Sequence, residues 1–199
     1  MEYHRPSSFA EAAELAASAK GVTRVLAGGT DVLVQMRADI VTPDTLIDIK
    51  SIEGARDIRQ EDDGSWTIGA AVAGAEMSEH PALCAAWPGV VEAMDLIGST
   101  QVQGRATLVG NLCNASPAAD SVPALVAANA TVSITGPKGH RRAAAVDIPS
   151  APGKTTLTPG ELITAVHLPA AQPRQGDAYL RFIPRTEMDI AVVGCGVWL

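Results

Sequence analysis

The sequence is poor in cysteine, histidine and aromatic residues, and these absences exclude several classes of site. Its three cysteines, Cys84, Cys113 and Cys195, are odd in number and widely spaced. Such a set provides neither a disulfide framework nor a cluster-binding spacing. The four histidines are equally scattered, so we expect no metal site. We interpret the cysteines as reduced thiols of a cytoplasmic protein.

Excess positive charge and long apolar runs are also missing. The chain has 15 Lys and Arg against 22 Asp and Glu, a net charge of −7, which argues against a nucleic-acid partner. No apolar run approaches the ~20 residues of a membrane-spanning helix. The N-terminus lacks the basic start and apolar core of a secretion signal. At 199 residues and 47% hydrophobic, the chain is expected to form one large domain or two small ones.

A stretch of low charge, residues 96–123, mixes small polar residues with apolar ones. Its Gly, Ser, Thr and Asn residues carry too many hydrogen-bonding groups to be buried unpaired, whereas Leu108 and Leu112 argue against a solvated linker. A backbone folded closely around a polyanionic ligand accounts for both features. Small residues let main-chain N–H groups approach phosphate, and Ser116 and Asp120 can meet hydroxyl groups.

A second candidate anion site lies near the N-terminus. Residues 23–27 are expected to form a strand, Gly28 and Gly29 a turn, and residues 32–36 a helix. This order places backbone donors at the start of a helix. The alternative is a tight turn without a ligand, because the spacing does not match the dinucleotide-binding G-x-G-x-x-G pattern.

The rest of the chain indicates a mixture of short helices and strands. Ser8 and Glu11 form a possible capping box for a helix over residues 6–21. Residues 149–158 are expected to be a loop, and the apolar run 189–199 is typical of a buried strand. The other expected helices cover residues 71–97 and 123–129, and the expected strands and hairpins cover residues 45–49, 55–70, 130–146, 161–168 and 179–183.

Four landmarks follow one another along the chain. They are AGGTD at residues 27–31, the stretch 97–120, PGELI at residues 159–163, and Arg185 followed by DIA at residues 189–191. The second contains I-G-S-x-Q and x-G-N-x-x-x-A-S-P and is highly specific, whereas the first and third are weak alone. Together they resemble the FAD-binding subunit of the xanthine dehydrogenase and carbon monoxide dehydrogenase family of molybdenum hydroxylases.

The resemblance implies an α+β fold of the PCMH-like, two-subdomain FAD-binding kind. The first subdomain would cover residues 1–54 and the second residues 55–176, with FAD between them. Residues 177–199 would begin a C-terminal α/β domain that is incomplete in this sequence.

The resemblance also assigns roles to individual positions. Residues 27–31 would hold the pyrophosphate, and residues 107–111 the pyrophosphate and ribityl region. Asp120 would meet ribityl hydroxyls, and Arg181 would be the basic residue near the flavin ring. Neither catalytic side chains nor metal ligands belong to the set. The candidate cofactor-binding residues are Ala27, Gly28, Gly29, Thr30, Asp31, Val32, Ile97, Thr107, Val109, Gly110, Asn111, Asn114, Ser116, Asp120, Ile163 and Arg181.

One position departs from the family pattern, because Val109 stands where the family has glycine. Valine disfavours a positive φ and crowds a close backbone approach. FAD binding would be weakened if the family's glycine uses either freedom. The other interpretation is that Val109 occupies a tolerant, extended position.

The function implied by the resemblance is electron transfer in an oxidoreductase. The chain would take electrons from 2Fe-2S clusters of a small subunit and pass them to NAD, oxygen or a quinone, and a large subunit would carry the molybdenum cofactor. The complex would be a cytoplasmic dimer of heterotrimers. Two alternatives remain: a degenerate structural subunit that no longer binds FAD, and a stand-alone flavin oxidase. The organic substrate and the final acceptor are not encoded in this sequence.

Overall fold

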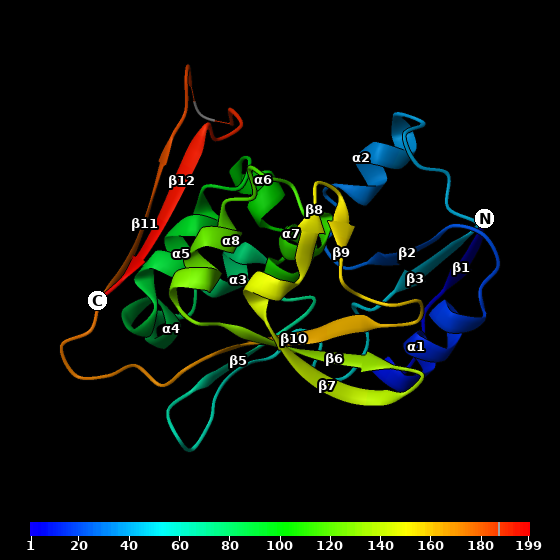
Figure 1. Ribbon diagram of the computed structural model, residues 1–199, viewed down its shortest axis with the longest axis horizontal. Coiled ribbons are helices and arrows are strands. Elements are labelled where there is room, and N and C mark those ends of the chain that lie inside the picture. Colours follow the sequence, from blue (N-terminus) through cyan, green and yellow to red (C-terminus); the bar gives the residue numbers. More distant parts are fainter. Residues whose placement is uncertain (187) are drawn as a thin grey trace.

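The computed structural model describes residues 1–186 and 188–199. A small N-terminal sheet lies at one end of the molecule, and a larger sheet lies beneath a layer of short helices (Figure 1). A two-stranded hairpin near the C-terminus runs along the opposite end of the helical layer (Figure 1). The mixed helix-and-strand composition is the one predicted.

The N-terminal sheet is parallel, and each connection between its strands contains a helix. Strands β1 (Glu2–His4), β2 (Thr23–Leu26) and β3 (Thr45–Asp48) are arranged in the order β1-β3-β2. Helices α1 (Phe9–Ser18) and α2 (Val32–Arg37) lie in the two connections. Parallel strands cannot be joined by a tight turn, so these crossovers are required. The segment after β2 therefore begins at the end of an edge strand, of which Leu26 is buried.

The start of α1 shows the predicted cap. The Ser8 hydroxyl accepts from the Glu11 N–H at 3.1 Å. The Glu11 carboxylate accepts from the Ser7 N–H and hydroxyl rather than from Ser8, so the cap differs in detail from the expected capping box. The helix is also shorter than the predicted 6–21.

The larger sheet is antiparallel throughout, with its most apolar strand in the centre. Its order is β4-β5-β10-β6-β7, so β10 pairs with β5 and β6. The buried core residues of its central strands, among them Ile68, Val132 and Val166, share one face, because paired residues of adjacent strands point the same way. The strands are β4 (Ile58–Gln60), β5 (Trp66–Gly69), β6 (Thr131–Gly136), β7 (Gly139–Ala144) and β10 (Leu162–Leu168).

The helical layer consists of short helices separated by prolines and small residues. Pro81 and Pro88 stand at the first helical position of α4 and α5, where a missing N–H costs nothing. The core between this layer and the sheet contains the fully buried Trp66, Trp87 and Leu125. The helices are α3 (Gly74–Ser78), α4 (Pro81–Ala86), α5 (Pro88–Asp95), α6 (Thr100–Gln103), α7 (Leu108–Asn114) and α8 (Ser121–Ala127).

The prediction of a plain loop over residues 149–158 was wrong. A short 3₁₀ turn, η1 (Ala145–Asp147), is followed by a small hairpin of β8 (Pro149–Ala151) and β9 (Lys154–Thr155). Gly153 supplies the turn with φ of +69°. The glycine and proline signals marked the turn correctly, but the pairing of such short strands depends on their surroundings.

The C-terminal hairpin consists of β11 (Asp177–Phe182) and β12 (Val193–Trp198), which pair antiparallel. The apolar run was expected to be buried, but only the inner face of the hairpin packs on α5 and α8. On the outer face Leu180 is 77% exposed and Phe182 61%.

The strands of the N-terminal sheet and those of the larger sheet come from separate parts of the chain. β1, β2 and β3 precede residue 54, and all strands of the larger sheet follow it. The boundaries at residues 54 and 176 remain a prediction.

Two glycines allow the hairpin to approach the helices closely. A Cβ atom on Gly89 of α5 would lie 2.6 Å from the backbone nitrogen of Ala178, and one on Gly196 would lie 2.4 Å from the Pro123 carbonyl oxygen. Contacts this short are not found for real side chains, so the hairpin would have to move.

We predict that Gly89→Ala loosens the hairpin and leaves the core folded. Alanine favours helix by about 1 kcal/mol over glycine, so α5 itself should not unfold. Amide hydrogen exchange of residues 177–182 and 193–198 should accelerate. Gly176→Ala, with open space around its position, is the matched control. Equal exchange in both variants would contradict the packing argument.

Candidate functional site

A large cavity lies where the N-terminal sheet meets the helical layer. Its volume is about 810 Å³, within the roughly 300–1,000 Å³ of typical ligand sites. The β2–α2 segment forms one wall, and the first turn of α7 forms another. A second cavity of about 250 Å³ adjoins the first and shares lining residues with it. The shared residues are Thr30, Asp31, Ile97, Asn111 and Asn114.

The structure brings the sequence-predicted residues together around these two cavities. Ser116, Asp120 and Arg181 line the smaller cavity. The larger cavity is lined by Ala27, Gly28, Gly29, Thr30, Asp31, Val32, Ile97, Thr107, Val109, Gly110, Asn111, Asn114 and Ile163. Their contacts with a cofactor remain a prediction.

The two glycine-containing segments are in direct backbone contact. A Cβ atom on Gly28 would lie only 2.1 Å from the Arg105 carbonyl oxygen. The Arg105 side chain also binds the Gly28 segment, because its Nε donates a hydrogen bond to the Gly28 carbonyl at 3.2 Å. Gly29 has φ of +80°, which other residues rarely adopt. Both glycines are therefore needed to form this wall of the cavity.

The first turn of α7 settles the conformation of Val109. Thr107 caps the helix, with its hydroxyl accepting from the Gly110 N–H at 2.9 Å. Val109 lies within the helix, is 6% exposed, and is not among the residues with positive φ. Valine is compatible with this backbone, so it imposes no strain there. The interpretation that Val109 is extended was wrong, since the position is helical.

Side-chain hydrogen bonds join α2 to α7 beside the cavity. Asn114 Nδ2 donates to Asp31 Oδ1 at 3.1 Å, and Gln35 Nε2 donates to Asn114 Oδ1 at 3.3 Å. Burial raises the pKa of Asp31. Sequence reasoning missed Gln35, whose role depends on α2 facing α7. No residue of α2 is buried, so these bonds are major contacts between that helix and the domain.

Cations are scarce around the cavities. Among residues 1–186 and 188–199, Arg24 is the one Lys or Arg that lines the larger cavity, and Arg181 is the one that lines the smaller. Arg24 donates to the Thr23 carbonyl, and Arg181 is paired with Asp120. An anionic ligand would therefore depend on main-chain N–H groups, which glycine and small residues leave accessible.

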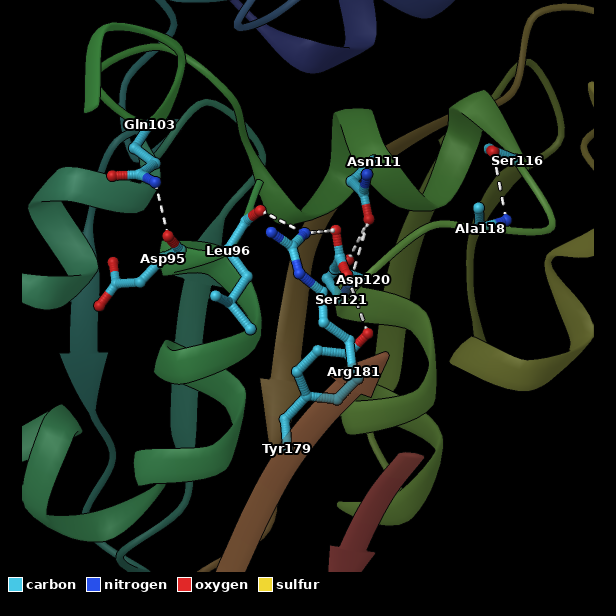
Figure 2. Close-up of polar contacts among 10 residues, drawn as sticks. All are labelled: Asp95, Leu96, Gln103, Asn111, Ser116, Ala118, Asp120, Ser121, Tyr179 and Arg181. Atoms are coloured by element: carbon cyan, nitrogen blue, oxygen red, sulfur yellow. Dashed lines mark hydrogen bonds and ion pairs between the residues drawn. The ribbon is translucent and has the colours of Figure 1, made fainter. Parts of the chain in front are cut away.

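A buried polar cluster closes the smaller cavity. Asp120, 8% exposed, accepts at Oδ1 from the Tyr179 hydroxyl at 2.9 Å and at Oδ2 from Arg181 at 3.1 Å (Figure 2). Arg181 also donates to the Leu96 carbonyl at 2.7 Å. Burial, and then the bond to Asp120, raise the pKa of Tyr179, so the hydroxyl remains a donor.

Two members of this region were missed at the sequence level. Tyr179 was not proposed as a site residue, although it lies two positions before Arg181 and therefore on the same face of a strand. Ser121 is fully buried and donates its hydroxyl to Asn111 Oδ1 at 2.6 Å. That bond fixes the amide oxygen of Asn111. The alternation along β11 could have identified Tyr179, but no local signal identifies Ser121.

Among the described residues, the lining of the two cavities offers neither a reactive thiol nor a group of metal-binding side chains. Cys113 lines the larger one, but burial raises the pKa of its thiol to about 12, so it remains protonated. Across the residues that the structure describes, no group of three His, Cys, Asp or Glu side chains could hold a metal ion. In the same part of the chain, every helix is too short or too polar to cross a membrane.

Comparison with known proteins places these features in a family. Residues 1–171 match the profile of the FAD binding domain in molybdopterin dehydrogenase. The chain is 32% identical over 195 residues to the xanthine dehydrogenase FAD-binding subunit of Escherichia coli O157:H7, covering 97% of this chain and 66% of that protein. It is 32% identical over 197 residues to the carbon monoxide dehydrogenase medium chain of Hydrogenophaga pseudoflava, covering 99% and 68% respectively.

Solved structures show the same fold. A carbon monoxide dehydrogenase from Hydrogenophaga pseudoflava superposes with a TM-score of 0.94 at 31% identity, covering 100% of this chain and 68% of that one. Quinoline 2-oxidoreductase from Pseudomonas putida 86 gives 0.88 at 25% identity, covering 98% and 66%. The predicted α+β FAD-binding fold is thereby confirmed. The chain spans about two thirds of the length of the relatives it matches.

We predict that Gly28→Ala abolishes stable flavin retention. The new methyl group would meet the Arg105 carbonyl and push apart the two segments that form the cavity wall. Flavin recovered with the purified protein should fall at least about tenfold. Gly104→Ala is the control, because its nearest contacts, at 3.7 Å, are ordinary. Retention that is equal in the two variants would contradict the role of this wall.

A second prediction concerns acid stability at the other end of the cavity. Hydrogen bonds from Arg141, and then from Thr158, lower the pKa of Glu161 to about 2 against the effect of burial. The pair therefore stabilises the fold fully above about pH 4.5, and the contribution disappears as pH falls towards 2.

Glu161→Gln should remove that contribution. Because Arg141 is 41% exposed, we expect about 1 kcal/mol at neutral pH rather than more. Urea unfolding at pH 7 and pH 3 should show a smaller difference between variant and parent at the lower pH. A difference that is the same at both pH values would contradict the assignment.

Proposed function

Since this chain belongs to the family of FAD-binding domains in molybdopterin dehydrogenases, we propose that it is the flavin-carrying, electron-transferring subunit of a molybdenum-containing hydroxylase or dehydrogenase. The observation that carries the proposal is the pair of joined cavities lined by both glycine-rich segments. In this proposal the subunit is an oxidoreductase component, and the organic substrate reacts elsewhere in the complex.

The residues around the cavities fit FAD. At Gly28 a side chain would fill the space that the two backbone segments share, and Gly29 holds a left-handed turn. Few cations are available there, so accessible main-chain N–H groups suit a pyrophosphate better than a salt bridge would. The smaller cavity offers Asp120 and Asn111, whose oxygen and nitrogen atoms suit hydroxyl groups.

In this proposal FAD carries out the redox chemistry, and the side chains of the protein bind it. When bound, FAD can accept electrons singly and release them in pairs, which is chemistry that no side chain of this set supplies. The chain's own residues bind, orient and shield. Residues 27–31 and 107–111 would hold the pyrophosphate, and Ile97 and Ile163 would offer apolar contact to the ring.

The partners in this proposal are a small subunit with 2Fe-2S clusters and a large subunit with the molybdenum cofactor, arranged as a dimer of heterotrimers. Cys84, Cys113 and Cys195 are free thiols far apart in sequence, which supports clusters on another chain and a location in the cytoplasm. The electrons would leave to NAD, oxygen or a quinone.

The test is cofactor analysis of the native complex together with Val109→Gly. We expect flavin in the parent complex at close to one per copy of this chain. The variant should lose about 2 kcal/mol of stability, because a buried side chain and helix propensity are both lost. Its flavin affinity should change less than about threefold. Val109→Ala separates the loss of volume from the effect of glycine.

The same experiment examines the alternative of a structural subunit without flavin. That alternative depended on Val109 and on the incomplete C-terminal domain. The helical conformation of Val109 removes the argument from backbone strain. An intact complex without flavin would overturn the proposal. Flavin binding that appears only in Val109→Gly would favour the structural subunit.

A further inference from the structure

The family profile ends at residue 171, but a wall of the smaller cavity comes from later residues. We propose that Tyr179 is a positioning residue for the flavin, which holds the Asp120 carboxylate in place and thereby couples docking of the β11–β12 hairpin to FAD binding. This inference rests on the proposed function. It adds to the site a residue that neither the glycine-rich segments nor the family match identifies.

Tyr179 is hydrogen-bonded directly to the Asp120 carboxylate. Its ring is 3% exposed, and its hydroxyl donates to Oδ1, whereas Arg181 occupies Oδ2 (Figure 2). Each carboxylate oxygen can accept more than one hydrogen bond, so both oxygens keep capacity for a ligand hydroxyl. With Arg181 alone, the carboxylate would be held at one oxygen and free to turn about that contact.

The neighbouring strand is shaped to admit the tyrosine. A Cβ atom on Gly194 of β12 would lie 2.3 Å from the Tyr179 hydroxyl oxygen. Glycine at this position therefore allows the ring to cross beneath β12 and reach Asp120. The nearest atom is the hydroxyl oxygen, followed by Cζ at 3.0 Å, so the close approach is to the end of the side chain that the proposal requires.

Strand β11, which carries Tyr179, also holds the hairpin against α5 through hydrogen bonds. The Tyr179 N–H donates to Glu92 Oε2 at 3.2 Å, and the Val90 N–H donates to Asp177 Oδ2 at 3.0 Å. Arg181 additionally holds the Leu96 carbonyl, next to the cavity-lining Ile97. A ligand that engages Asp120 or Ile97 therefore favours the docked hairpin, and docking favours the ligand by the same factor.

The decisive experiment measures FAD affinity of the native complex after its flavin has been removed. Tyr179→Phe, which retains the ring and deletes the hydroxyl, should raise the FAD dissociation constant about tenfold. Tyr3→Phe is the matched control, because the Tyr3 hydroxyl donates to Asp48 in a similar pair away from both cavities. It should leave the constant unchanged.

A double-mutant cycle distinguishes positioning from a general structural effect. If Tyr179 acts through Asp120, Tyr179→Phe should change FAD affinity less than about twofold in an Asp120→Asn background. Additive effects of the two substitutions would overturn the inference. Gly194→Ala, which displaces the hydroxyl without touching Asp120, should weaken FAD binding as Tyr179→Phe does.

A measurement on the unsubstituted complex keeps the proposal testable if a variant does not fold. Added FAD should slow amide hydrogen exchange in residues 177–182, and it should leave the β7 amides, residues 139–144, unchanged. If FAD binds but residues 177–182 exchange at the same rate, the inference fails and the proposed function stands. If the parent complex binds no FAD at all, the proposed function itself fails.

Discussion

The close contact between the Gly28 segment and the Arg105 carbonyl is the constraint on which the site depends. It joins the end of β2 in the N-terminal sheet to the segment that leads into α7. Main-chain atoms can meet at this distance only where no Cβ intervenes. The backbone around Gly28 and the backbone at residues 105–106 are in contact at one edge of the larger cavity, which both segments line.

Both sheets hold in place the segments that line the larger cavity. The parallel N-terminal sheet fixes where residues 27–31 leave β2, and the central strand β10 carries Ile163 to the cavity from the larger sheet. A hydrogen bond from Asn114 to Asp31 then joins α7 to the start of α2, a helix without buried residues.

Polar side chains buried near the smaller cavity occur in satisfied groups. Asp120 has two donors, and the buried Ser121 hydroxyl has Asn111 as its acceptor. Left unpaired, a buried polar group costs about 1–3 kcal/mol, and a charged one costs more. The arrangement consequently fixes side chains that a flexible loop could not hold, and it includes residues from a hairpin distant in the sequence.

The sequence by itself determined the elements that depend on local chemistry. Ser8 marked a helix start, Gly28 and Gly29 marked the turn after β2, and the spacing of residues 97–120 identified the family. It did not determine that Val109 is helical, that Tyr179 meets Asp120, or that Ser121 meets Asn111. The reason is physical. Capping and turn formation involve neighbours along the chain, whereas burial and long-range hydrogen bonds depend on which surfaces the folded backbone brings together.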